Sequence, residues 1–343
     1  LYTQSGVNID AGNESVRRIK DAVKGTHTSA VLTGIGSFGG LYDIGEVLKS
    51  YHHPVLVQSI DGVGTKLSVA RMMNKYDTVG EDIVNHCCDD LLAMGARSLT
   101  FLDYVAHDKL DPSVMEQMVR GMAKACSENG VSLIGGETAE MPGVYASGEH
   151  DIAGCITGVV EKNKIITGER IEEGDIMLGL PSSGLHTNGF SLARKILFSV
   201  AGHKVDEEVS EFGMTVGEAL MKVHVNYSRP VLEMLDKGVD IRGVAHITGG
   251  GFVENIPRVL LETLDAEINK GTWPMLPIFP YMQKVGSVPE AEMYRVFNMG
   301  IGLVLIVPQS EKEKIEKILE SYPDYKIFEI GKIIKGDGKV VLK

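Results

Sequence analysis

The chain has 343 residues, which is long enough for a large core and, by length alone, for two domains. Its 34 basic and 46 acidic side chains give a net charge of −12, which argues against nucleic acid as the main partner because nucleic-acid binders carry a basic face. No run approaches roughly 18 consecutive apolar residues, so we expect neither a membrane-spanning helix nor a membrane partner.

The cysteines are Cys87, Cys88, Cys126 and Cys155. They form no C-x-x-C pair and have no paired histidine spacing, which disfavours a zinc site. The first residues, L-Y-T-Q-S-G, do not form a signal-peptide pattern. We therefore expect a cytoplasmic protein with reduced, mostly buried thiols.

The first glycine cluster reads G-I-G-S-F-G-G from Gly34 to Gly40. It matches the G-x-G-x-x-G pattern of dinucleotide sites at Gly34, Gly36 and Gly39. The preceding strand is weak, however, and Gly45 interrupts the helix that should follow. We therefore favour a flexible glycine loop that covers a nucleotide over a Rossmann site.

The next segment, S-I-D-G-V-G-T-K-L, follows an apolar run and joins Asp61 to Lys66 through Gly62 and Gly64. Magnesium prefers carboxylate and phosphate oxygens, so Asp61 at a strand end is a candidate magnesium ligand. Lys66 can neutralise a phosphate as a point charge. The alternative is a tight turn with a surface ion pair, and this segment alone does not decide between the two.

Two adjacent carboxylates, Asp89 and Asp90, open the segment that ends at Ser98. Neighbouring residues point to different faces of a helix, so at most one of them can join Asp61, and we expect the other to be solvated. A surface helix turn is the alternative for both.

A helix is predicted between Asp111 and Gly130. Asp111 suits an N-cap, Pro112 suits the first helical position, and Gly130 suits the end. Its apolar residues recur at helical spacing and predict a core-facing stripe: Met115, Met118, Val119, Met122 and Cys126.

The segment L-I-G-G-E-T-A-E-M-P-G, Leu133 to Gly143, reads as a strand followed by a glycine pair and carboxylates. The group Glu137, Thr138 and Glu140 could add a metal ligand or orient a ribose. A charged stretch with two glycines then separates two glycine-rich halves, and we place the domain boundary near Gly168, between residues 1–168 and 169–343.

The second half repeats a pattern of strand, glycine loop and helix in residues 178–195 and 245–258. Each turn carries a histidine, His186 or His246, with threonine nearby. A single histidine is more often structural, but two in parallel settings favour ligand contact. The amides of Gly249 to Gly251 could hold a phosphate.

Two local patterns lie near the C-terminus. Ser310 and Glu313 form a capping-box pattern ahead of an apolar helix face. The segments Tyr325 to Lys335 and Lys339 to Leu342 flank G-D-G, which predicts a hairpin. The residues alone thus predict a cytosolic, magnesium-dependent, nucleotide-using enzyme with a second phosphate site, and they do not name its substrate.

The same motifs, in the same order over nearly the whole chain, resemble the phosphoribosylformylglycinamidine cyclo-ligase, or aminoimidazole ribonucleotide synthetase, family. The motifs are G-V-N-I-D-A-G-N from Gly6, D-G-V-G-T-K-L from Asp61, F-L-D-Y from Phe101, G-G-E-T-A-E-M-P-G from Gly135, H-T-N-G-F-S-L from His186, H-I-T-G-G-G-F-V-E-N-I-P-R from His246 and M-Y-R-V-F-N-M-G-I-G from Met293.

The resemblance implies an α/β fold of the α+β type, with two domains of mixed sheets flanked by helices. The N-terminal domain would bind ATP and dimerise through its sheets, and the C-terminal domain would hold the substrate phosphate. The implied activity is the ATP- and Mg²⁺-dependent cyclisation of formylglycinamidine ribonucleotide to aminoimidazole ribonucleotide, ADP and phosphate, through an iminophosphate, in purine biosynthesis.

The resemblance also implies site residues. The nucleotide side would comprise Gly34, Gly36, Ser37, Phe38, Gly39, Gly40, Asp61, Gly62, Gly64, Thr65, Lys66, Asp90, Asp103, Glu137 and Thr138, with Asp61, Asp90 and Glu137 as magnesium ligands. The substrate side would comprise His186, Thr187, Asn188, Thr248, Gly249, Gly250 and Gly251. Lys66, His186 and His246 are the candidates for catalytic roles, and no general base is assigned.

The chain departs from the family pattern near the second carboxylate. Ser98 stands where proline is expected, which loosens that turn, and Asp89 stands where asparagine is usual. Both departures weaken the assignment of Asp90 without removing it.

Sister enzymes of the superfamily and a non-catalytic regulator remain alternatives. Selenophosphate synthetase would need a Cys or selenocysteine near the first glycine loop, and residues 26–41 contain none. The hydrogenase maturation factor would need a C-terminal cysteine, whereas the last residues read K-V-V-L-K. Thiamine-monophosphate kinase lacks the paired histidine motifs in this form. A regulator would be expected to lose charged site residues, and Asp61, Lys66, Asp90 and Glu137 are all present.

Overall fold

A computed structural model describes residues 7–343; Gly6, the first residue of the first family motif, lies outside them. The chain divides into two compact units. The N-terminal unit runs through Leu91 and includes Ala96–Asn163, and the C-terminal unit comprises Leu92–Gly95 and Lys164–Lys343. The main change of unit therefore falls between residues 163 and 164, whereas the sequence suggested a boundary near Gly168.

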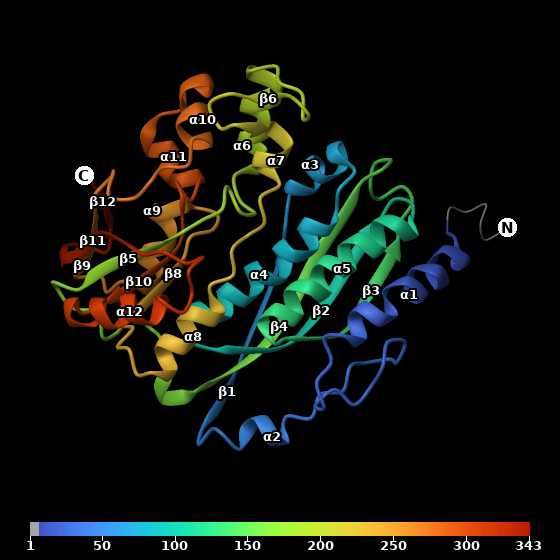
Figure 1. The fold of residues 1–343 in the computed structure, drawn as a ribbon, viewed down its shortest axis with the longest axis horizontal. Coiled ribbons are helices and arrows are strands. Elements are labelled where there is room, and N and C mark those ends of the chain that lie inside the picture. The colour runs from blue at the N-terminus through green and yellow to red at the C-terminus, as the bar shows by residue number, and fades with distance from the viewer. Residues whose placement is uncertain (1–6) are drawn as a thin grey trace. The chain divides into compact units, whose positions relative to one another are not determined.

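From residue 7 onward, the N-terminal unit contains five helices and one four-stranded sheet, which Figure 1 shows. In chain order its elements are α1 (Ile9–Lys24), α2 (Gly45–Leu48), β1 (Pro54–Gly62), α3 (Lys66–Met73), α4 (Asp77–Ala93), β2 (Arg97–His107), α5 (Pro112–Asn129), β3 (Ser132–Glu140) and β4 (His150–Glu161).

Helix α5 forms where its end signals predict it. The Asp111 carboxylate accepts a hydrogen bond from the Ser113 amide, and Gly130 ends the helix with φ of 67°. The predicted stripe is buried, since Met115, Met118 and Met122 are at most 1% exposed. The interpretation of this stripe as core is confirmed.

The four strands lie in the order β1-β4-β2-β3. Because β4 runs antiparallel to both β1 and β2, and β3 runs parallel to β2, the strands β1, β2 and β3 share one direction. Their carboxyl ends therefore meet at one edge of the sheet, which is where open sheets with helices bind ligands.

The two faces of this sheet differ. One face packs against helices: at Gly154 of β4, the side-chain direction points at Phe101 and at Ile83 of α4. The other face exposes large apolar side chains, namely Leu56, Ile60, Leu102 and Tyr104, which are 37–71% exposed. Contiguous exposed apolar surface of this kind marks an interaction face.

The C-terminal unit is built on a six-stranded sheet in the order β12-β9-β11-β5-β10-β8. Its strands are β5 (Ile176–Pro181), β8 (Gly243–His246), β9 (Leu264–Ile268), β10 (Ile301–Val307), β11 (Phe328–Lys335) and β12 (Val340–Leu342), and a short hairpin pairs β6 (Glu208–Val209) with β7 (Met214–Thr215). Every residue of β10 is buried, as expected for a central strand.

The helices of this unit are α6 (Phe190–Arg194), which continues as a π-helix over Lys195–Val200, α7 (Val216–Leu220), α8 (Ser228–Asp236), α9 (Gly251–Asn255), α10 (Ile278–Gly286), α11 (Glu290–Val296) and α12 (Lys312–Leu319). Residues of α8 and α12, among them Met234, Ile315 and Ile318, join Leu178 and Leu305 of the sheet in one buried cluster. This cluster is the core of the unit.

Two local predictions near the C-terminus are wrong. The strands flanking G-D-G do not form a hairpin, because β9 lies between them and pairs with β11 on one side and β12 on the other. The pattern at Ser310 forms a 3₁₀ turn over Gln309–Glu311, and no side chain caps α12. Non-local pairing thus overrides the turn signal.

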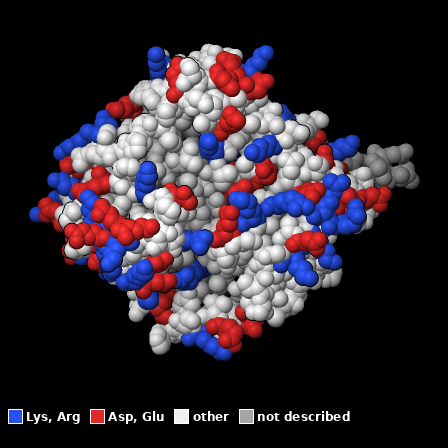
Figure 2. All heavy atoms as spheres, in the orientation of Figure 1, with Lys and Arg blue, Asp and Glu red and all other residues white. Residues whose placement is uncertain are grey.

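Among residues 7–343, no helix combines the length and the apolar character needed to cross a membrane. Figure 2 shows acidic and basic side chains interspersed over the visible face. Cys87, Cys88 and Cys126 are buried and Cys155 is half-buried, as expected for the thiols.

Candidate functional site

Three parallel strands of the N-terminal unit bring the predicted nucleotide residues into one row. Asp61 of β1 and Asp103 of β2 both pair with Gly154 of β4, and Asp103 also pairs with Gly136 of β3. Directly paired residues project from the same face of a sheet. Because neighbouring strands lie about 4.8 Å apart, Asp61 and Asp103 are separated by roughly 10 Å on the helix-covered face.

Asp61 and Asp90 form one cluster with a histidine that the sequence interpretation did not include. The Nε2 atom of His86 lies 2.8 Å from Asp61 Oδ2 and 3.7 Å from Asp90 Oδ2. The Ser59 hydroxyl donates to Asp90 Oδ2 at 3.1 Å. One ligand atom from each of Asp61, His86 and Asp90 lies within 4.8 Å of the others, which is close enough for a shared cation.

His86 lies inside this cluster and is 3% exposed. Burial lowers the pKa of its imidazole, but the hydrogen bond to Asp61 and the charge of Asp90 outweigh burial and raise the pKa above the ordinary histidine value. In its protonated form, His86 would offset one of the two carboxylate charges. A divalent cation would take over that role, with the carboxylate oxygens as the harder and preferred ligands.

The structure separates the adjacent carboxylates as their spacing predicts. Asp90 points to Asp61, whereas Asp89 is fully buried. The expectation that the second carboxylate is solvated is wrong, because that side of α4 faces the interior. Ser98, the departure from the family pattern, lies within β2 paired with Gly158, so an extended strand rather than a proline fixes the backbone there.

The Lys66 ammonium is buried against a carboxylate. Its side chain is 0% exposed, and Nζ lies 2.7 Å from Oδ2 of Asp82, which is also 0% exposed. Burial lowers the pKa of Lys66, and the charge of Asp82 opposes this shift. The first turn of α3 directs the side chain into the unit toward Asp82 of α4, and the proposed contact of Lys66 with a phosphate stays a prediction.

Asp103 lies in a small cavity of about 80 Å³ on the helix-covered face. The other lining residues come from α1, α5 and β3, and include Ile35 of the glycine loop and Thr138. Burial raises the pKa of Asp103 to about 7, and the neighbouring charge of Glu137 adds to this shift. Near neutral pH, such a carboxyl can donate a hydrogen bond when it is protonated and only accepts hydrogen bonds when it is ionised.

Gly136 leaves room for this carboxyl. A Cβ at residue 136 would lie 2.2 Å from Asp103 Oδ1, a distance that two such atoms cannot share. Glycine is therefore required beside Asp103 by close approach, not by its backbone angles.

Glu137 lies apart from the other predicted metal ligands. Paired with Tyr104, it projects from the exposed face of the sheet, opposite to Asp103 and Asp61. Successive residues of a strand point to opposite faces of the sheet. Within one copy of the chain, Glu137 therefore lies on the other face from Asp61 and does not join Asp61 and Asp90.

The glycine loop from Gly34 to Gly40 is a surface loop. Leu32 and Leu41 close its base through a backbone hydrogen bond of 2.9 Å. Five of its residues are exposed: Gly34, Gly36, Ser37, Phe38 and Gly39. The loop is not part of a strand–loop–helix unit, so a Rossmann site is excluded there. Its contact with the Asp103 cavity is through Ile35.

Gly64 and Thr65 line another open cavity at the start of α3, of about 270 Å³. Gly62 ends β1, and its amide donates to Asp61 Oδ1 at 2.7 Å. The D-G-V-G-T segment therefore joins the carboxylate cluster to this cavity.

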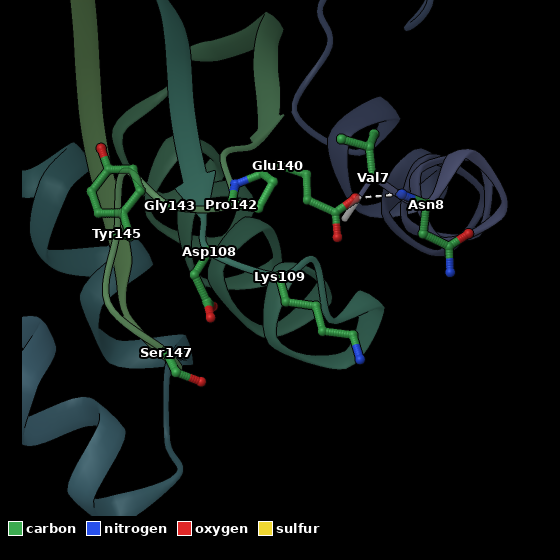
Figure 3. A pocket seen from close by; sticks show the side chains of 9 residues that line it. All are labelled: Val7, Asn8, Asp108, Lys109, Glu140, Pro142, Gly143, Tyr145 and Ser147. Atoms are coloured by element: carbon green, nitrogen blue, oxygen red, sulfur yellow. Dashed lines mark hydrogen bonds between the residues drawn. The ribbon is translucent and has the colours of Figure 1, made fainter. Parts of the chain in front are cut away.

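A larger polar cavity of about 560 Å³ lies at the carboxyl edge of β2 and β3. Figure 3 shows it between Val7 and Asn8 at the start of α1, the Asp108–Lys109 turn and the loop from Pro142 to Ser147. Glu140 joins these segments, because its carboxylate accepts from the amides of Asn8 at 2.5 Å and Leu110 at 2.9 Å. The family motifs at residues 7–13 and 135–143 thus meet at this cavity.

In the C-terminal unit, His186 is buried and held by the backbone. It adopts φ of 61°, which is unusual for a residue other than glycine. Its Nε2 faces the amides of Ser183 and Val225 at 3.3 and 3.4 Å and accepts from them, so the ring proton resides on Nδ1. This geometry favours a structural role for His186 over proton transfer through Nε2.

His246 pairs with a histidine that no motif marked. The Nε2 atoms of His224 and His246 lie 3.1 Å apart, His224 stacks on His186 at 4.0 Å, and Thr187 Oγ1 lies 3.4 Å from His224 Nδ1. All three histidines are at most 6% exposed. The two predicted histidines are thus brought together by His224, which sits in the featureless sequence V-H-V.

The loop Thr248–Gly251 lies beside the H-T-N turn. A Cβ at Gly249 would lie 3.2 Å from Asn188 Oδ1, so the two predicted substrate segments are neighbours. Gly249 is exposed and Thr248 and Gly250 are half-buried. The grouping of these residues on the substrate side therefore has a physical basis in one unit.

Comparisons with known proteins cover both units. The family model described as AIR synthase related protein, N-terminal domain, matches residues 42–160, and the corresponding C-terminal domain model matches residues 172–343. The chain is 46% identical to the phosphoribosylformylglycinamidine cyclo-ligase of Alkaliphilus metalliredigens, over 99% of this chain and 97% of that protein. It is 49% identical to the protein of the same name from Carboxydothermus hydrogenoformans, over 99% and 98%.

Solved structures of lower identity share the fold. A thiamine-monophosphate kinase from Stenotrophomonas maltophilia has a TM-score of 0.70 at 15% identity and covers 96% of each chain. The hydrogenase maturation protein HypE in complex with ATP has a TM-score of 0.63 at 18% identity, over 95% of this chain and 88% of that chain. With a family model over each half and relatives nearly half identical over almost their full length, the chain belongs to the AIR synthase related protein family.

Proposed function

We propose that this protein is an ATP-dependent cyclo-ligase that converts formylglycinamidine ribonucleotide to aminoimidazole ribonucleotide, ADP and phosphate in cytoplasmic purine biosynthesis. The observation that carries the proposal is the 46–49% identity, over nearly the whole length, to proteins named phosphoribosylformylglycinamidine cyclo-ligase. The carboxylate row of the N-terminal unit and the phosphate loop of the C-terminal unit support it.

The chemistry requires an activated oxygen. An amide oxygen is a poor leaving group, so the formyl oxygen first takes the terminal phosphoryl group of ATP, which forms an iminophosphate and ADP. The ring-forming nitrogen then attacks the formyl carbon, and phosphate departs with that oxygen. The protein contributes positioning and charge neutralisation.

Asp61 and Asp90 fit a magnesium ion, which would neutralise the phosphates of ATP. Their oxygens converge on His86 Nε2, and both carboxylates are partly exposed. We assign the magnesium ion to Asp61 and Asp90. Glu137 projects from the exposed face of the sheet, so we assign it to the nucleotide only if a second copy of the chain packs on that face and completes the site.

The nucleotide side consists of the glycine loop, Gly62 to Thr65 and the Asp103 cavity. Ile35 connects the loop to that cavity, where Thr138 and Asp103 offer polar groups. Lys66 supports this side through its ion pair with Asp82 rather than through a ligand. On the substrate side, we assign ribose and phosphate recognition to Thr187, Asn188 and the Thr248–Gly251 loop, with His186 and His246 as its buried support.

We also propose a homodimer formed through the exposed sheet face. Leu56, Ile60, Leu102 and Tyr104 gather there, and Cys155 lies between Ile60 and Leu102 in the ladder.

Since Cys155 is the one cysteine in residues 7–343 that is not buried, its maleimide labelling reports on this face. Slow labelling in the wild type and fast labelling in an Ile60→Asp variant that sediments as a monomer would support the dimer; fast labelling in both would contradict it.

The function is tested by incubating the purified protein with Mg²⁺, ATP and formylglycinamidine ribonucleotide, and by measuring ADP and the coloured diazo derivative of aminoimidazole ribonucleotide. Equal amounts of both products support the proposal. ADP without the imidazole product would indicate a sister kinase-like enzyme. ATP binding with neither product would indicate a regulatory protein.

A further inference from the structure

One buried asparagine controls the shape of the Thr248–Gly251 loop. Asn255 is 2% exposed and lies at the end of α9. Its Nδ2 lies 3.3 Å from the carbonyl oxygen of Thr248, 3.1 Å from that of Gly249 and 2.8 Å from that of Gly251. Its Oδ1 accepts from the Thr248 hydroxyl at 3.3 Å.

These contacts fix the orientation of the amide group. Carbonyl oxygens only accept hydrogen bonds, so the atom that faces three of them has to be the donor, Nδ2. The hydroxyl of Thr248 then meets the only remaining polar atom of the side chain, Oδ1. Asn255 therefore uses its whole polar end on this loop.

These contacts separate the carbonyl oxygens of the loop from the amides of Gly249 and Gly250. The carbonyl oxygens of Thr248, Gly249 and Gly251 face Asn255, and that of Gly250 accepts from the Glu254 amide. The amides of Thr248 and Gly251 donate to the carbonyls of His246 and Thr248. Within residues 7–343, the amides of Gly249 and Gly250 donate to no protein acceptor. Gly249 is exposed and Gly250 is half-buried, so a ligand can reach both amides.

The backbone of the loop is compatible with glycine alone. Gly250 and Gly251 adopt φ of +95° and +57°, in the region that favours glycine. A Cβ at Gly251 would lie 2.2 Å from the Tyr294 carbonyl oxygen. Such a tight turn with outward amides suits an anion.

We infer that Asn255 is the positioning residue for the substrate phosphate: it holds the loop carbonyls inward so that the amides of Gly249 and Gly250 meet the anion. This inference rests on the proposed function and deepens it, because it names the buried side chain that shapes the loop already assigned to the ribonucleotide phosphate. Asn188 lies beside Gly249, so the ligand would contact the loop on one side and Asn188 on the other.

The test is Asn255→Asp, measured as KM for formylglycinamidine ribonucleotide, KM for ATP and kcat, together with inhibition by inorganic phosphate. An aspartate has the same shape and still accepts from Thr248, but it cannot donate to carbonyls and its charge repels them. Because the displaced amides would no longer donate hydrogen bonds to a charged group, we expect KM for the ribonucleotide to rise about tenfold or more and KM for ATP to change less than about twofold. Phosphate inhibition should weaken by a factor similar to that in the ribonucleotide KM.

Asn226→Asp is the matched control, since Asn226 accepts from the Ser228 amide through Oδ1 and an aspartate preserves that bond. It should leave both KM values unchanged. If Asn255→Asp does not fold, Thr248→Val removes only the hydroxyl contact and should raise the ribonucleotide KM selectively by a smaller factor.

Equal increases in both KM values, or a lower melting temperature with unchanged KM, would overturn the positioning role. Failure of the inference is distinct from failure of the proposed function, since the wild type would still form the imidazole product.

Discussion

The buried pair Lys66–Asp82 gives a prediction that separates a structural lysine from a phosphate-binding one. Both side chains are 0% exposed and their charged atoms lie 2.7 Å apart. In Lys66→Met the Asp82 carboxylate remains buried without this cation, which destabilises a protein by roughly 3–5 kcal/mol. With roughly 2–4 °C lost per kcal/mol for units of this size, the melting temperature should fall by about 10 °C.

The assay is thermal unfolding followed by circular dichroism, combined with ATP binding at a temperature well below the transition. The double variant Lys66→Met/Asp82→Leu removes both charges and should recover most of the lost stability, because well-packed apolar residues replace buried ion pairs with little loss. Lys75→Met, which removes an exposed lysine next to α3, is the matched control and should melt like the wild type.

A Lys66→Met variant that melts within about 1 °C of the wild type but no longer binds ATP would contradict the structural role of Lys66. That result would return Lys66 to the phosphate, as the sequence pattern suggested. Reduced stability with ATP affinity retained at low temperature would confirm the structural role.

Further predictions concern the metal, the sheet row and pH. Asp61→Asn should raise the Mg²⁺ concentration for half-maximal activity about tenfold, because one carboxylate of the pair is lost. Gly136→Ala should destabilise the protein by about 1–3 kcal/mol and weaken ATP binding, because its Cβ would lie 2.2 Å from Asp103 Oδ1. Burial and the charge of His150 lower the pKa of His107 to about 4. The unfolded chain therefore binds more protons, and about 3 kcal/mol of stability should be lost as pH falls from about 6.5 to about 4.

Each of these has a control and a contradicting result. Asp324→Asn, at an exposed position, should leave the Mg²⁺ titration unchanged; an unchanged titration in Asp61→Asn would remove Asp61 from the metal site. Gly12→Ala in α1, where a Cβ meets nothing within 4 Å, should be neutral or stabilising, and equal behaviour of Gly136→Ala would contradict the close approach. His107→Gln should flatten the acid limb of the stability curve, and an unaltered limb would exclude His107 as its cause.

Local signals were sufficient for part of the fold. Asp111, Pro112 and Gly130 specify α5 because caps and helix ends depend on residues close in the chain. The C-terminal hairpin could not be predicted in the same way. Strand β9 inserts between β11 and β12 from about 70 residues away in sequence, and such pairing depends on tertiary packing.

The candidate site could likewise be predicted only where local sequence signals were sufficient. Asp61 and Asp90 were recognised because carboxylates beside glycine turns suggest metal binding, but His86 was not, although it lies four residues before Asp90 on the same helical face. The burial of Lys66 depends on Asp82, a residue in another helix. The direction of Glu137 depends on a strand register that a sequence alone does not reveal.

The most direct measurement of the central claim follows the formyl oxygen of the substrate. Formylglycinamidine ribonucleotide labelled with ¹⁸O at that position is converted with Mg²⁺ and ATP, and inorganic phosphate is analysed by mass spectrometry. Activation as an iminophosphate predicts that the label appears in phosphate, one labelled oxygen for each aminoimidazole ribonucleotide formed. Label recovered in water, with unlabelled phosphate, would contradict phosphoryl transfer to the substrate and with it the proposed use of this site.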